Sequence, residues 1–498
     1  MDNEVKTERL VVVSNRLPIT LRRHKGRLVL SKASGGLITA LQPLLKAQKG
    51  VWVGWPGTTD YTEEEIAPLI QKFEMEAGYR LVPIMLTKEE VSGYYDGFSN
   101  EIIWPLFHDL HSLCNFNPSY WKQYEAVNEK FARKVMEVSS PRDFLWIQDY
   151  HLILLAKKLK NLGFKEKLTF FLHIPFAPLD IFLKIPWRFD LLRAMLSYDF
   201  IGFQTMRDQR NFIHSVRTLL GDAAVKGSGN KTVCMTHDTQ TQIGTFPISI
   251  DFREFTSKAD RPEVLSECVK LKNSLSNRKM VFSLDRLDYT KGIPYRLEAI
   301  RTFLMKYPEY HGKVNFIQVV VPSRTEIPGY YELKQKIDRL VGEINSEYTT
   351  SGWIPIHYMF HPLTELQLVS FYRASDVCLV TPVKDGMNLV SKEFAAANIE
   401  EEGVLVLSEF AGSACQLKEA CLLVNPYDRE RMADAIYQAL EMGETERRNR
   451  MKRLRKKIRD EDIYHWVESV FQSIGEEPGF SHPVAPEYIP AEVSPLDK

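Results

Sequence analysis

Two carboxylates near the last third of the chain have a spacing that suits the recognition of hydroxyl groups. Asp385 and Glu393 are eight residues apart, with the apolar Leu389 midway between them. On a helix this i, i+4, i+8 spacing places the three side chains on one stripe. The carboxylates can then accept hydrogen bonds from two sets of hydroxyls, as in a sugar nucleotide with Asp385 at the sugar and Glu393 at the ribose. The same spacing also fits a capped surface helix whose glutamate is solvated.

The elements around these carboxylates read as strand, turn and helix. Residues 377–383 form a short apolar run rich in β-branched side chains, which predicts a buried strand. Residues 384–386 predict a tight turn, and residues 387–398 a helix that Asp385 caps. In an open parallel sheet, ligands bind at the carboxyl ends of strands and against helix N-termini. The free amides and the positive end of the helix dipole favour an anion there.

Two cations follow another predicted strand of the same half. Residues 280–284 predict that strand, and the loop after it carries Arg286 and Lys291. The planar fork of arginine matches phosphate oxygens, and lysine supplies a movable point charge. Together with the helix at Asp385 they predict a diphosphate site. No D-x-D motif stands at a strand end, so we expect no metal ion and assign the stabilisation of a departing nucleotide diphosphate to the cations.

In the first half, polar side chains follow successive predicted strands. Arg16 comes after the strand at 9–15, Asp149 after 144–148 and His173 after 168–172, which predicts that they share a cleft. The Ser34-Gly35-Gly36 sequence precedes a predicted amphipathic helix at 37–49 and would let backbone approach a phosphate. Residues 94–105 form an aromatic cluster in a region predicted to be rich in turns; such rings stack on sugars but are more often core.

Composition describes an ordinary globular chain. It has 498 residues, of which 64 are Lys or Arg and 64 Asp or Glu, so the net charge is zero and bulk electrostatics argue against a nucleic-acid binder. The basic run at 447–459 is interpreted as a solvated helix. Six scattered cysteines without a C-x-x-C pair indicate reduced thiols and a cytoplasmic protein, and no segment predicts a signal peptide or a membrane span. The alternation of strands and helices predicts an α/β protein built of two doubly wound halves.

Taken together, the motifs resemble the trehalose-6-phosphate synthase family, which comprises retaining GT-B glycosyltransferases (family 20). The resemblance covers about residues 9–471 and rests on these motifs: V-V-S-N-R, S-G-G-L, Y-D-G-F-S-N before I-W-P, Q-D-Y-H, H-I-P-F, G-F-Q-T, D-R-L-D-Y-T-K-G and D-G-M-N-L-V-S-K-E. It implies transfer of glucose from UDP-glucose to glucose 6-phosphate. It also implies two Rossmann-like domains facing across a deep cleft: 1–248 for the acceptor, 249–460 for the nucleotide sugar, a helix at 461–478 crossing back, and a flexible tail at 479–498.

The resemblance also implies roles for individual residues. Arg286 and Lys291 would grip the diphosphate, and His173 would line the reacting face. The implied donor site consists of Gly36, His173, Arg286, Lys291, Asp385, Gly386, Met387, Asn388, Leu389, Val390 and Glu393. The implied acceptor site consists of Arg16, Trp55, Tyr95, Trp104, Asp149 and Arg324. The implied catalytic residues are Asp149, His173, Arg286, Lys291 and Asp385.

The chain departs from the family pattern at three positions. Gln148 stands where the family usually has His, Ser249 where it has Gly, and Lys384 where Arg is common. Two alternatives stay open: a related retaining transferase with another nucleotide sugar or acceptor, cyclitols included, or a catalytically silent subunit that senses glucose 6-phosphate. We expect no metal or other cofactor, and as partners a second copy of the chain or a separate trehalose-6-phosphate phosphatase, since no D-x-D-x-T motif is present. No nucleic acid or membrane partner is expected.

Overall fold

The computed structural model describes residues 9–24, 27–33, 36–324 and 328–475. The chain divides into two compact units. It passes from the first unit to the second between Pro247 and Ile248, and returns to the first between Trp466 and Val467. The first of these boundaries lies one residue before the expected boundary at 248/249. The expected returning helix at 461–478 corresponds to α19 (Ile463–Gly475), whose residues from Val467 onward belong to the first unit. The expected tail at 479–498 lies outside the described residues.

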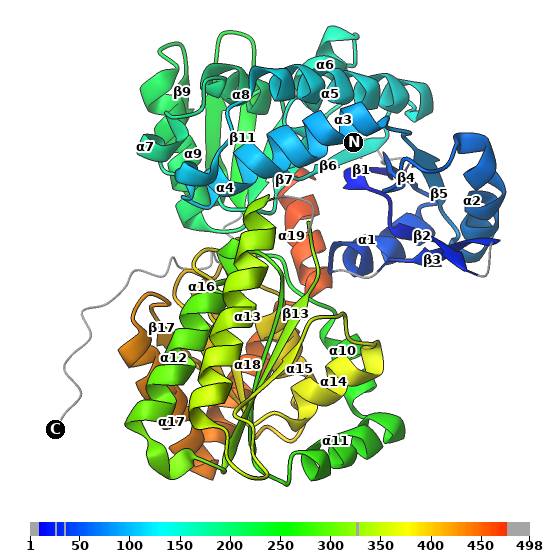
Figure 1. Cartoon of the computed structure of the whole chain (residues 1–498). Helices are drawn as coiled ribbons and strands as arrows, with labels where there is room; N and C mark the ends of the chain where they lie inside the picture. The colour runs from blue at the N-terminus through cyan, green and yellow to red at the C-terminus, as the bar shows by residue number, and fades with distance from the viewer. Residues whose placement is uncertain (1–8, 25–26, 34–35, 325–327, 476–498) are drawn as a thin grey trace. The chain divides into compact units, whose positions relative to one another are not determined.

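Within its described residues, the first unit is built on a nine-stranded sheet (Figure 1). Its strands in spatial order are β5 (Arg80–Pro83), β4 (Val51–Trp55), β1 (Leu10–Arg16), β6 (Phe144–Gln148), β7 (Leu168–Leu172), β8 (Phe200–Phe203), β11 (Gln240–Thr245), β10 (Thr232–Met235) and β9 (Ala224–Lys226). All neighbours are parallel except the last two pairs. From β1 the chain adds strands first on one side and then, from β6, on the other. The topological switch point of this sheet therefore lies between β1 and β6.

Helices and one hairpin complete the first unit. The hairpin pairs β2 (Ile19–His24) with β3 (Arg27–Lys32). The helices are α1 (Gly36–Ala47), α2 (Glu63–Ala77), α3 (Lys88–Glu90), α4 (Trp104–Phe107), α5 (Pro118–Val138), α6 (Leu155–Asn161), α7 (Leu179–Phe182), α8 (Arg188–Met195) and α9 (Met206–Leu219). Phe471 of α19 packs its ring against Phe144 and Trp146 of β6.

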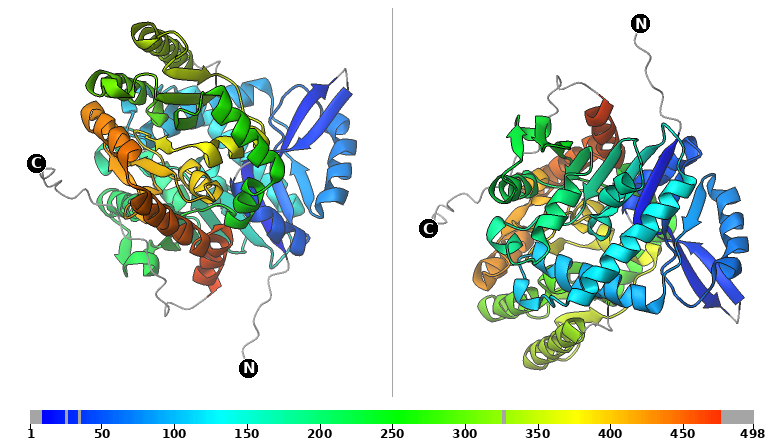
Figure 2. Two further views of the ribbon diagram at one scale, coloured as in Figure 1. Left: turned by 90° about the horizontal axis from the view of Figure 1, so that it is seen from below. Right: turned by 90° about the horizontal axis from the view of Figure 1, so that it is seen from above.

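The prediction that residues 94–105 are rich in turns is wrong. Residues Val91–Ile103 form a continuous helix with π-type winding that runs on into α4. This segment lies beside α5 in Figures 1 and 2. A Cβ on Gly93 would come within 2.5 Å of Gln123, and one on Gly97 within 2.6 Å of the Tyr120 ring. These glycines therefore allow two helices to pack closely. From sequence alone, glycines that serve helix packing cannot be distinguished from glycines that form turns.

In its described residues the second unit has a parallel six-stranded sheet. The spatial order is β14 (Ile356–Met359), β13 (Val314–Val321), β12 (Lys279–Arg286), β15 (Val377–Val380), β16 (Val404–Ser408) and β17 (Leu422–Val424). Strands are added in one direction from β12 to β14 and in the other from β15. The switch point of this sheet lies between β12 and β15.

Two helical layers cover the second sheet, as Figure 1 shows. One layer shares an apolar core with one face of the sheet and consists of α12 (Ile293–Lys306), α13 (Pro328–Tyr348) and α17 (Arg429–Glu441). The other layer covers the opposite face and consists of α10 (Phe252–Ala259), α11 (Pro262–Ser274), α14 (Glu365–Ala374), α15 (Val390–Ala397), α16 (Ala414–Leu417) and α18 (Glu444–Asp460). Both faces of the central strands are buried, which explains why their sequences are mostly apolar.

The strand and helix expected around Asp385 are displaced. Strand β15 ends at Val380 and helix α15 begins at Val390, so the intervening nine residues form a loop. Asp385 does not cap the helix, and the expected stripe of Asp385, Leu389 and Glu393 on one helix is wrong. The side chain of Asn388 accepts a hydrogen bond from the Ser391 amide at 3.2 Å and serves the first turn instead. No helix among the described residues is long and apolar enough to cross a membrane.

Candidate active site

Lys291 and Asp385 meet at the switch point of the second sheet. Lys291 follows the carboxyl end of β12, and Asp385 lies in the loop after β15. The Lys291 ammonium donates a hydrogen bond to Asp385 Oδ2 at 2.6 Å, and both side chains are largely buried. Arg286, the last residue of β12, is exposed, and its side chain makes no hydrogen bond or ion pair within the described part of the chain. The structure thus brings together the three charged residues predicted for a diphosphate site.

A buried aspartate organises the cations of this site. The Asp288 carboxylate lies 3.6 Å from Arg324 Nη1 and accepts a hydrogen bond from the Thr290 amide at 2.9 Å. Arg324 Nη1 also donates to the Tyr330 hydroxyl at 2.7 Å. Burial alone would raise the pKa of Asp288, but Arg324, Lys291 and Arg286 outweigh burial and hold that pKa below its ordinary value. Asp288 therefore stays ionised and keeps Arg324, Lys291 and Arg286 near one another. Three cations around one carboxylate leave a net positive charge, which attracts a further anion.

The loop around Asp385 is held by a segment far along the chain. The Asp385 amide donates to the Phe410 carbonyl at 3.2 Å, and the Gly412 amide donates to the Asp385 carbonyl at 2.8 Å. A Cβ on Gly412 would collide with the carbonyl of Gly386, so only glycine allows this approach. The Met387 amide donates to Asp385 Oδ1 at 3.2 Å. These contacts fix the carboxylate of Asp385 beside Lys291.

The rest of the predicted donor site lies on the next turn of the loop and on α15. Asn388 has a left-handed backbone with a φ of 55°, which turns the chain just before the helix. Met387, Leu389 and Val390 are partly exposed around it, while Gly386 is buried. Amides of the first turn of α15 are used locally: the Lys392 and Glu393 amides donate to the Leu389 carbonyl at 2.9 and 2.8 Å. Partly exposed residues thus surround the start of α15, next to the loop that carries Asp385.

Glu393 lies one turn into α15 and is oriented by a second helix. The Tyr372 hydroxyl of α14 donates to Glu393 Oε2 at 2.9 Å. Burial raises the pKa of Glu393, and the hydrogen bond from Tyr372 opposes that rise. The carboxylate is therefore held in one orientation and can accept a hydroxyl.

The residue before Glu393 on α15 is a buried lysine, which contacts the first residue of the second unit. Lys392 donates to the Ile248 carbonyl at 2.7 Å and to Gln416 Oε1 at 2.6 Å. Burial lowers the pKa of Lys392 to about 8. Ile248 is the first residue of the second unit, so Lys392 ties the helix that carries Glu393 to the start of this unit.

In the first unit, Arg16 and two predicted aromatic residues form a connected group. The Arg16 guanidinium lies over the Trp55 ring, 4.8 Å from its centroid. The Trp55 ring meets Tyr95 edge-on at 5.7 Å between centroids, and Tyr95 stacks on His151 at 5.8 Å. Gly57 has a φ of 89°, and a Cβ there would collide with the Arg16 side chain. The structure thus places a cation and an aromatic surface at the carboxyl end of β1.

Asp149 and His173 meet at the ends of β6 and β7. The His173 amide donates to Asp149 Oδ1 at 3.1 Å. Asp149 has φ 74° and ψ 168°, a region that is almost restricted to glycine. Such strain persists where the surroundings enforce it, and it is concentrated at active sites. Asp149 is therefore aimed by the backbone beside the switch point of the first sheet.

The imidazole of His173 is buried between two glutamines. Gln148 Oε1 lies 2.8 Å from Nε2, and Gln204 Nε2 lies 3.0 Å from Nδ1. This pairing suits the tautomer that is protonated on Nε2. Burial lowers the pKa of His173 to about 3, so the ring is neutral at physiological pH. Gln148, the departure from the family motif, thus has a defined structural role.

The remaining two predicted residues occupy helices of the first unit. Trp104 begins α4, is buried, and lies with its ring 5.8 Å from Tyr150, which in turn contacts His151. Gly36 begins α1. The structure groups Arg16, Trp55, Tyr95, Trp104, Asp149 and His173 in the first unit. It groups Arg286, Lys291, Arg324 and residues 385–393 in the second.

Comparison with known proteins gives the family. A model described as glycosyltransferase family 20 matches residues 8–476. The chain belongs to glycosyltransferase family 20. The family 20 chain is therefore an enzyme that transfers sugars, and its two sheets are the two Rossmann-like units of the GT-B class.

Relatives of this family 20 chain include both single and fused enzymes. A trehalose-6-phosphate synthase of Mycobacterium sp. (strain JLS) is 37% identical, over 94% of this chain and 96% of that protein. A bifunctional trehalose-6-phosphate synthase/phosphatase of Thermoproteus tenax is 40% identical over 92% of this chain. The family 20 chain covers 62% of the length of that second relative.

Solved structures resemble the chain over most of its length. One named "trehalose-6-phosphate from E. coli bound with UDP-2-fluoro glucose" has a TM-score of 0.84 and 34% identity, covering 94% of this chain and 99% of the other. A UDP-forming α,α-trehalose-phosphate synthase from Burkholderia xenovorans, in complex with glucose-6-phosphate, has a TM-score of 0.83 and 30% identity, covering 94% and 100%.

Sequence reasoning missed the residues that hold the family 20 site in place. Asp288, Tyr330 and Tyr372 orient Arg324 and Glu393, and Arg296 neutralises Asp285. The only sequence signal was the charge density of residues 285–291, which indicated a functional loop but not which side chains face each other. No cluster of three or more His, Cys, Asp or Glu side chains that could hold a metal ion occurs in the described segments.

Proposed function

We propose that this family 20 enzyme transfers glucose from UDP-glucose to glucose 6-phosphate and releases UDP and α,α-trehalose 6-phosphate. The observation that carries the proposal is the cation group at the switch point of the second sheet. There Arg286 and Lys291 lie near the Asp288 carboxylate, beside the loop that leads into α15. This group and the nearby Glu393 provide positive charge for a nucleotide diphosphate and a carboxylate for the ribose. The relative solved with UDP-2-fluoro glucose supports the donor, and the relative solved with glucose-6-phosphate supports the acceptor.

The proposed reaction retains the configuration of the sugar. The acceptor hydroxyl attacks on the face from which UDP leaves, and a phosphate oxygen of the leaving group takes its proton. The new C–O bond forms as the bond from the glucose carbon to the diphosphate oxygen breaks. No enzymic nucleophile is needed, in contrast to the two-carboxylate glycosidases. Rate enhancement then comes from positioning and from stabilising the charge that develops on the diphosphate.

Lys291 and Asp385 exchange partners in this scheme. Their ion pair at 2.6 Å holds both groups ready in the absence of substrate. When the donor binds, the Lys291 ammonium contacts the diphosphate, and Asp385 accepts hydroxyls of the glucose. His173, neutral because of its low pKa, positions the sugar and does not supply a proton.

We further propose that turnover needs no metal ion and that the enzyme works in the cytoplasm. All six cysteines are free, which suits a reducing compartment. Removal of the phosphate from the product would fall to a separate phosphatase, in line with the fused synthase/phosphatase of T. tenax. Self-association is a further proposal, and light scattering of the purified chain tests it.

A UDP-release assay tests the proposed function. We expect UDP release with UDP-glucose and glucose 6-phosphate together, and little with either alone. Parallel reactions with GDP-glucose and ADP-glucose identify the nucleotide, NMR identifies the disaccharide, and EDTA should leave the rate unchanged. Binding of glucose 6-phosphate without any UDP release would point to the silent sensor. Turnover only with another acceptor would point to a related transferase, and reversible loss of activity in EDTA would refute metal independence.

Arg324→Ala should chiefly raise KM for glucose 6-phosphate. Removing a charged hydrogen-bond partner costs about 1.5–3 kcal/mol, which corresponds to a rise of about ten- to hundredfold. Initial rates at varied acceptor and saturating donor measure it. Tyr330→Phe is the matched control, since it removes the hydroxyl bonded to Arg324 but keeps the guanidinium. If KM rises for UDP-glucose instead, Arg324 acts on the donor site through Asp288, and its assignment to the acceptor site is wrong.

A further inference from the structure

Helix α15 carries the donor-site carboxylate Glu393 but is only eight residues long. Helices shorter than about 12–15 residues are marginal in isolation, so contacts with other segments must fix the position of α15. Near its C-terminal end, Arg455 of α18 donates hydrogen bonds to the carbonyls of Ala395 and Ala396 at 3.0 and 2.6 Å. The first turn, where Glu393 lies, therefore needs anchors of its own.

Lys392 anchors this first turn from the interior of the second unit. The residue is 1% exposed, and its ammonium donates to the Ile248 carbonyl at 2.7 Å and to Gln416 Oε1 at 2.6 Å. The preceding residue, Ser391, adds a hydrogen bond from its hydroxyl to Ser413 Oγ at 2.9 Å. A buried ammonium is costly unless its hydrogen bonds are made, so the two acceptors leave Lys392 little freedom to move.

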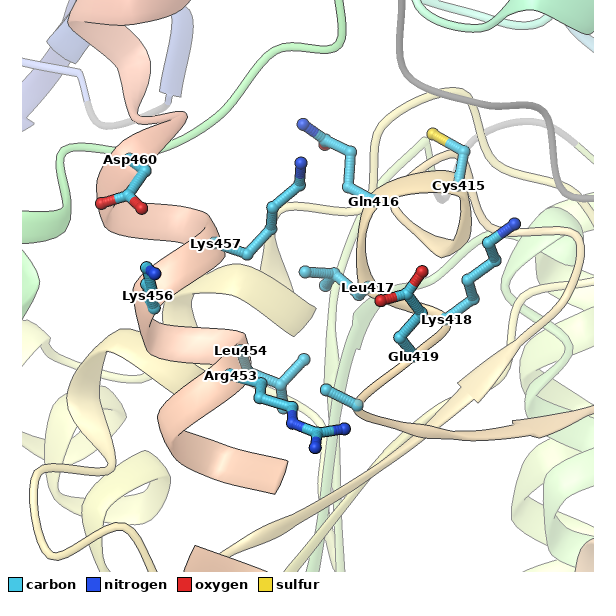
Figure 3. A pocket seen from close by; sticks show the side chains of 11 residues that line it. Cys415, Gln416, Leu417, Lys418, Glu419, Arg453, Leu454, Lys456, Lys457 and Asp460 are labelled. Atoms are coloured by element: carbon cyan, nitrogen blue, oxygen red, sulfur yellow. The ribbon is translucent and has the colours of Figure 1, made fainter. Parts of the chain in front are cut away.

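Gln416, the side-chain acceptor, is itself held by a carboxylate. Its amide donates to Glu461 Oε2 at 2.8 Å, and Glu461 Oε1 accepts a hydrogen bond from Lys457 of α18. Gln416 and Lys457 line the pocket shown in Figure 3, where they reach from facing elements and their polar ends lie close together. The Gln416 amide is thus fixed at both of its ends, which makes it a rigid partner for Lys392.

We propose that Lys392 is a positioning residue for the donor, which holds Glu393 where its carboxylate can accept the ribose hydroxyls of the nucleotide. The inference rests on the proposed function, in which Glu393 binds the ribose. Successive side chains of a helix point about 100° apart, so Lys392 and Glu393 leave α15 in different directions. Lys392 is bonded to Ile248 and Gln416, and Glu393 to Tyr372 of α14. Contacts on two sides keep the helix from turning about its axis, which would displace the carboxylate.

Calorimetric binding of UDP and of 2′,3′-dideoxy-UDP to the full chain tests this role without turnover. The two ligands differ only in the ribose hydroxyls. We expect the wild type to bind UDP at least about tenfold more tightly than the dideoxy ligand, because hydrogen bonds to a carboxylate are strong. Lys392→Met keeps a side chain of similar length but loses both hydrogen bonds. Its preference for UDP should fall below about threefold, while its affinity for 2′,3′-dideoxy-UDP stays within about twofold of the wild type.

Lys457→Met is the matched control, since in the described structure this lysine bonds Glu461 but not α15. It should keep the wild-type preference for UDP, and Glu393→Ala should lose it completely. Thermal melting followed by circular dichroism shows whether each variant folds. If Lys392→Met does not fold, Gln416→Met replaces it; this variant removes one of the two bonds of Lys392 and should lower the preference at least about twofold.

The outcomes separate this inference from the proposed function. If Lys392→Met binds both ligands more weakly by the same factor, or keeps the wild-type preference, Lys392 does not position Glu393 and the inference is overturned. The proposed donor role of Glu393 would then still stand if Glu393→Ala loses the preference. If Glu393→Ala keeps the preference, or the wild type does not bind UDP, the proposed donor site is wrong and the inference fails with it.

Discussion

Lys291→Ala should lower kcat by about 10²–10³-fold while the fold stays intact. Loss of one group that stabilises developing charge costs about 3–4 kcal/mol in the transition state. In the proposed mechanism Lys291 contacts the diphosphate from the switch point, and its ammonium donates to Asp385 Oδ2 at 2.6 Å. In that mechanism the substitution removes a charge at the leaving group and the ion-pair partner of Asp385. Steady-state rates with saturating UDP-glucose and glucose 6-phosphate measure the effect.

Lys279→Ala is the matched control for this experiment. Lys279 begins the same strand, and its ion pair with Asp376 at 2.8 Å is exposed to solvent. Its removal should leave kcat within about twofold of the wild type, because exposed ion pairs contribute about 0–1 kcal/mol and this one lies at the opposite end of β12. Near-wild-type turnover of Lys291→Ala would remove Lys291 from the proposed mechanism.

Arg296→Met should destabilise the second unit by about 3–5 kcal/mol. Arg296 is almost fully buried in α12 and donates to Asp285 Oδ2 at 2.6 Å, to Thr381 at 2.9 Å and to Gln318 at 3.3 Å. Removing one partner of such a pair leaves an uncompensated buried charge, which is the source of the cost. Burial already raises the pKa of Asp285, and the loss of Arg296 would raise it further. Urea unfolding followed by circular dichroism measures the change.

Two comparisons separate the buried pair from lost packing. Asp285→Asn/Arg296→Met removes both charges and should recover part of the stability, since a buried carboxylate is no longer left alone. Arg301 lies on the same helix as Arg296, and Arg301→Ala breaks its exposed ion pair with Glu347 of α13. This substitution should lower the free energy of unfolding by at most about 1 kcal/mol. An Arg296→Met protein as stable as Arg301→Ala would show that the pair contributes little to folding.

The sequence predicted the two sheets well because their strands carry local signals. Residues buried on both faces are mostly apolar, so β1, β12 and β13 appear as short runs rich in apolar residues, with a few buried polar ones such as Asn315 and Gln318. The polar residue after each run marks the carboxyl end of the strand. Arg16, Asp149 and Arg286 were found in this way, and each lies at or beside a switch point in the structure.

Loops and helix starts could not be predicted in the same way. The residues after β15 have helical composition, yet α15 begins only at Val390. Asp385 is held instead by Phe410 and Gly412, about 25 residues further along the chain. Gly93 and Gly97 resemble turn residues, but their lack of a side chain serves the packing of two helices. In both places a contact with a distant segment overrides local preference.

By itself, the sequence determined which residue types are available, where the strands end, and that the chain contains two α/β halves, because these depend on burial patterns over a few residues. Only the tertiary structure decided that Asp288 lies among the cations of the second unit and that Tyr372 orients Glu393. Those arrangements join segments tens of residues apart. They follow from the way the helical layers and loops pack against each sheet, and no spacing along the chain encodes them.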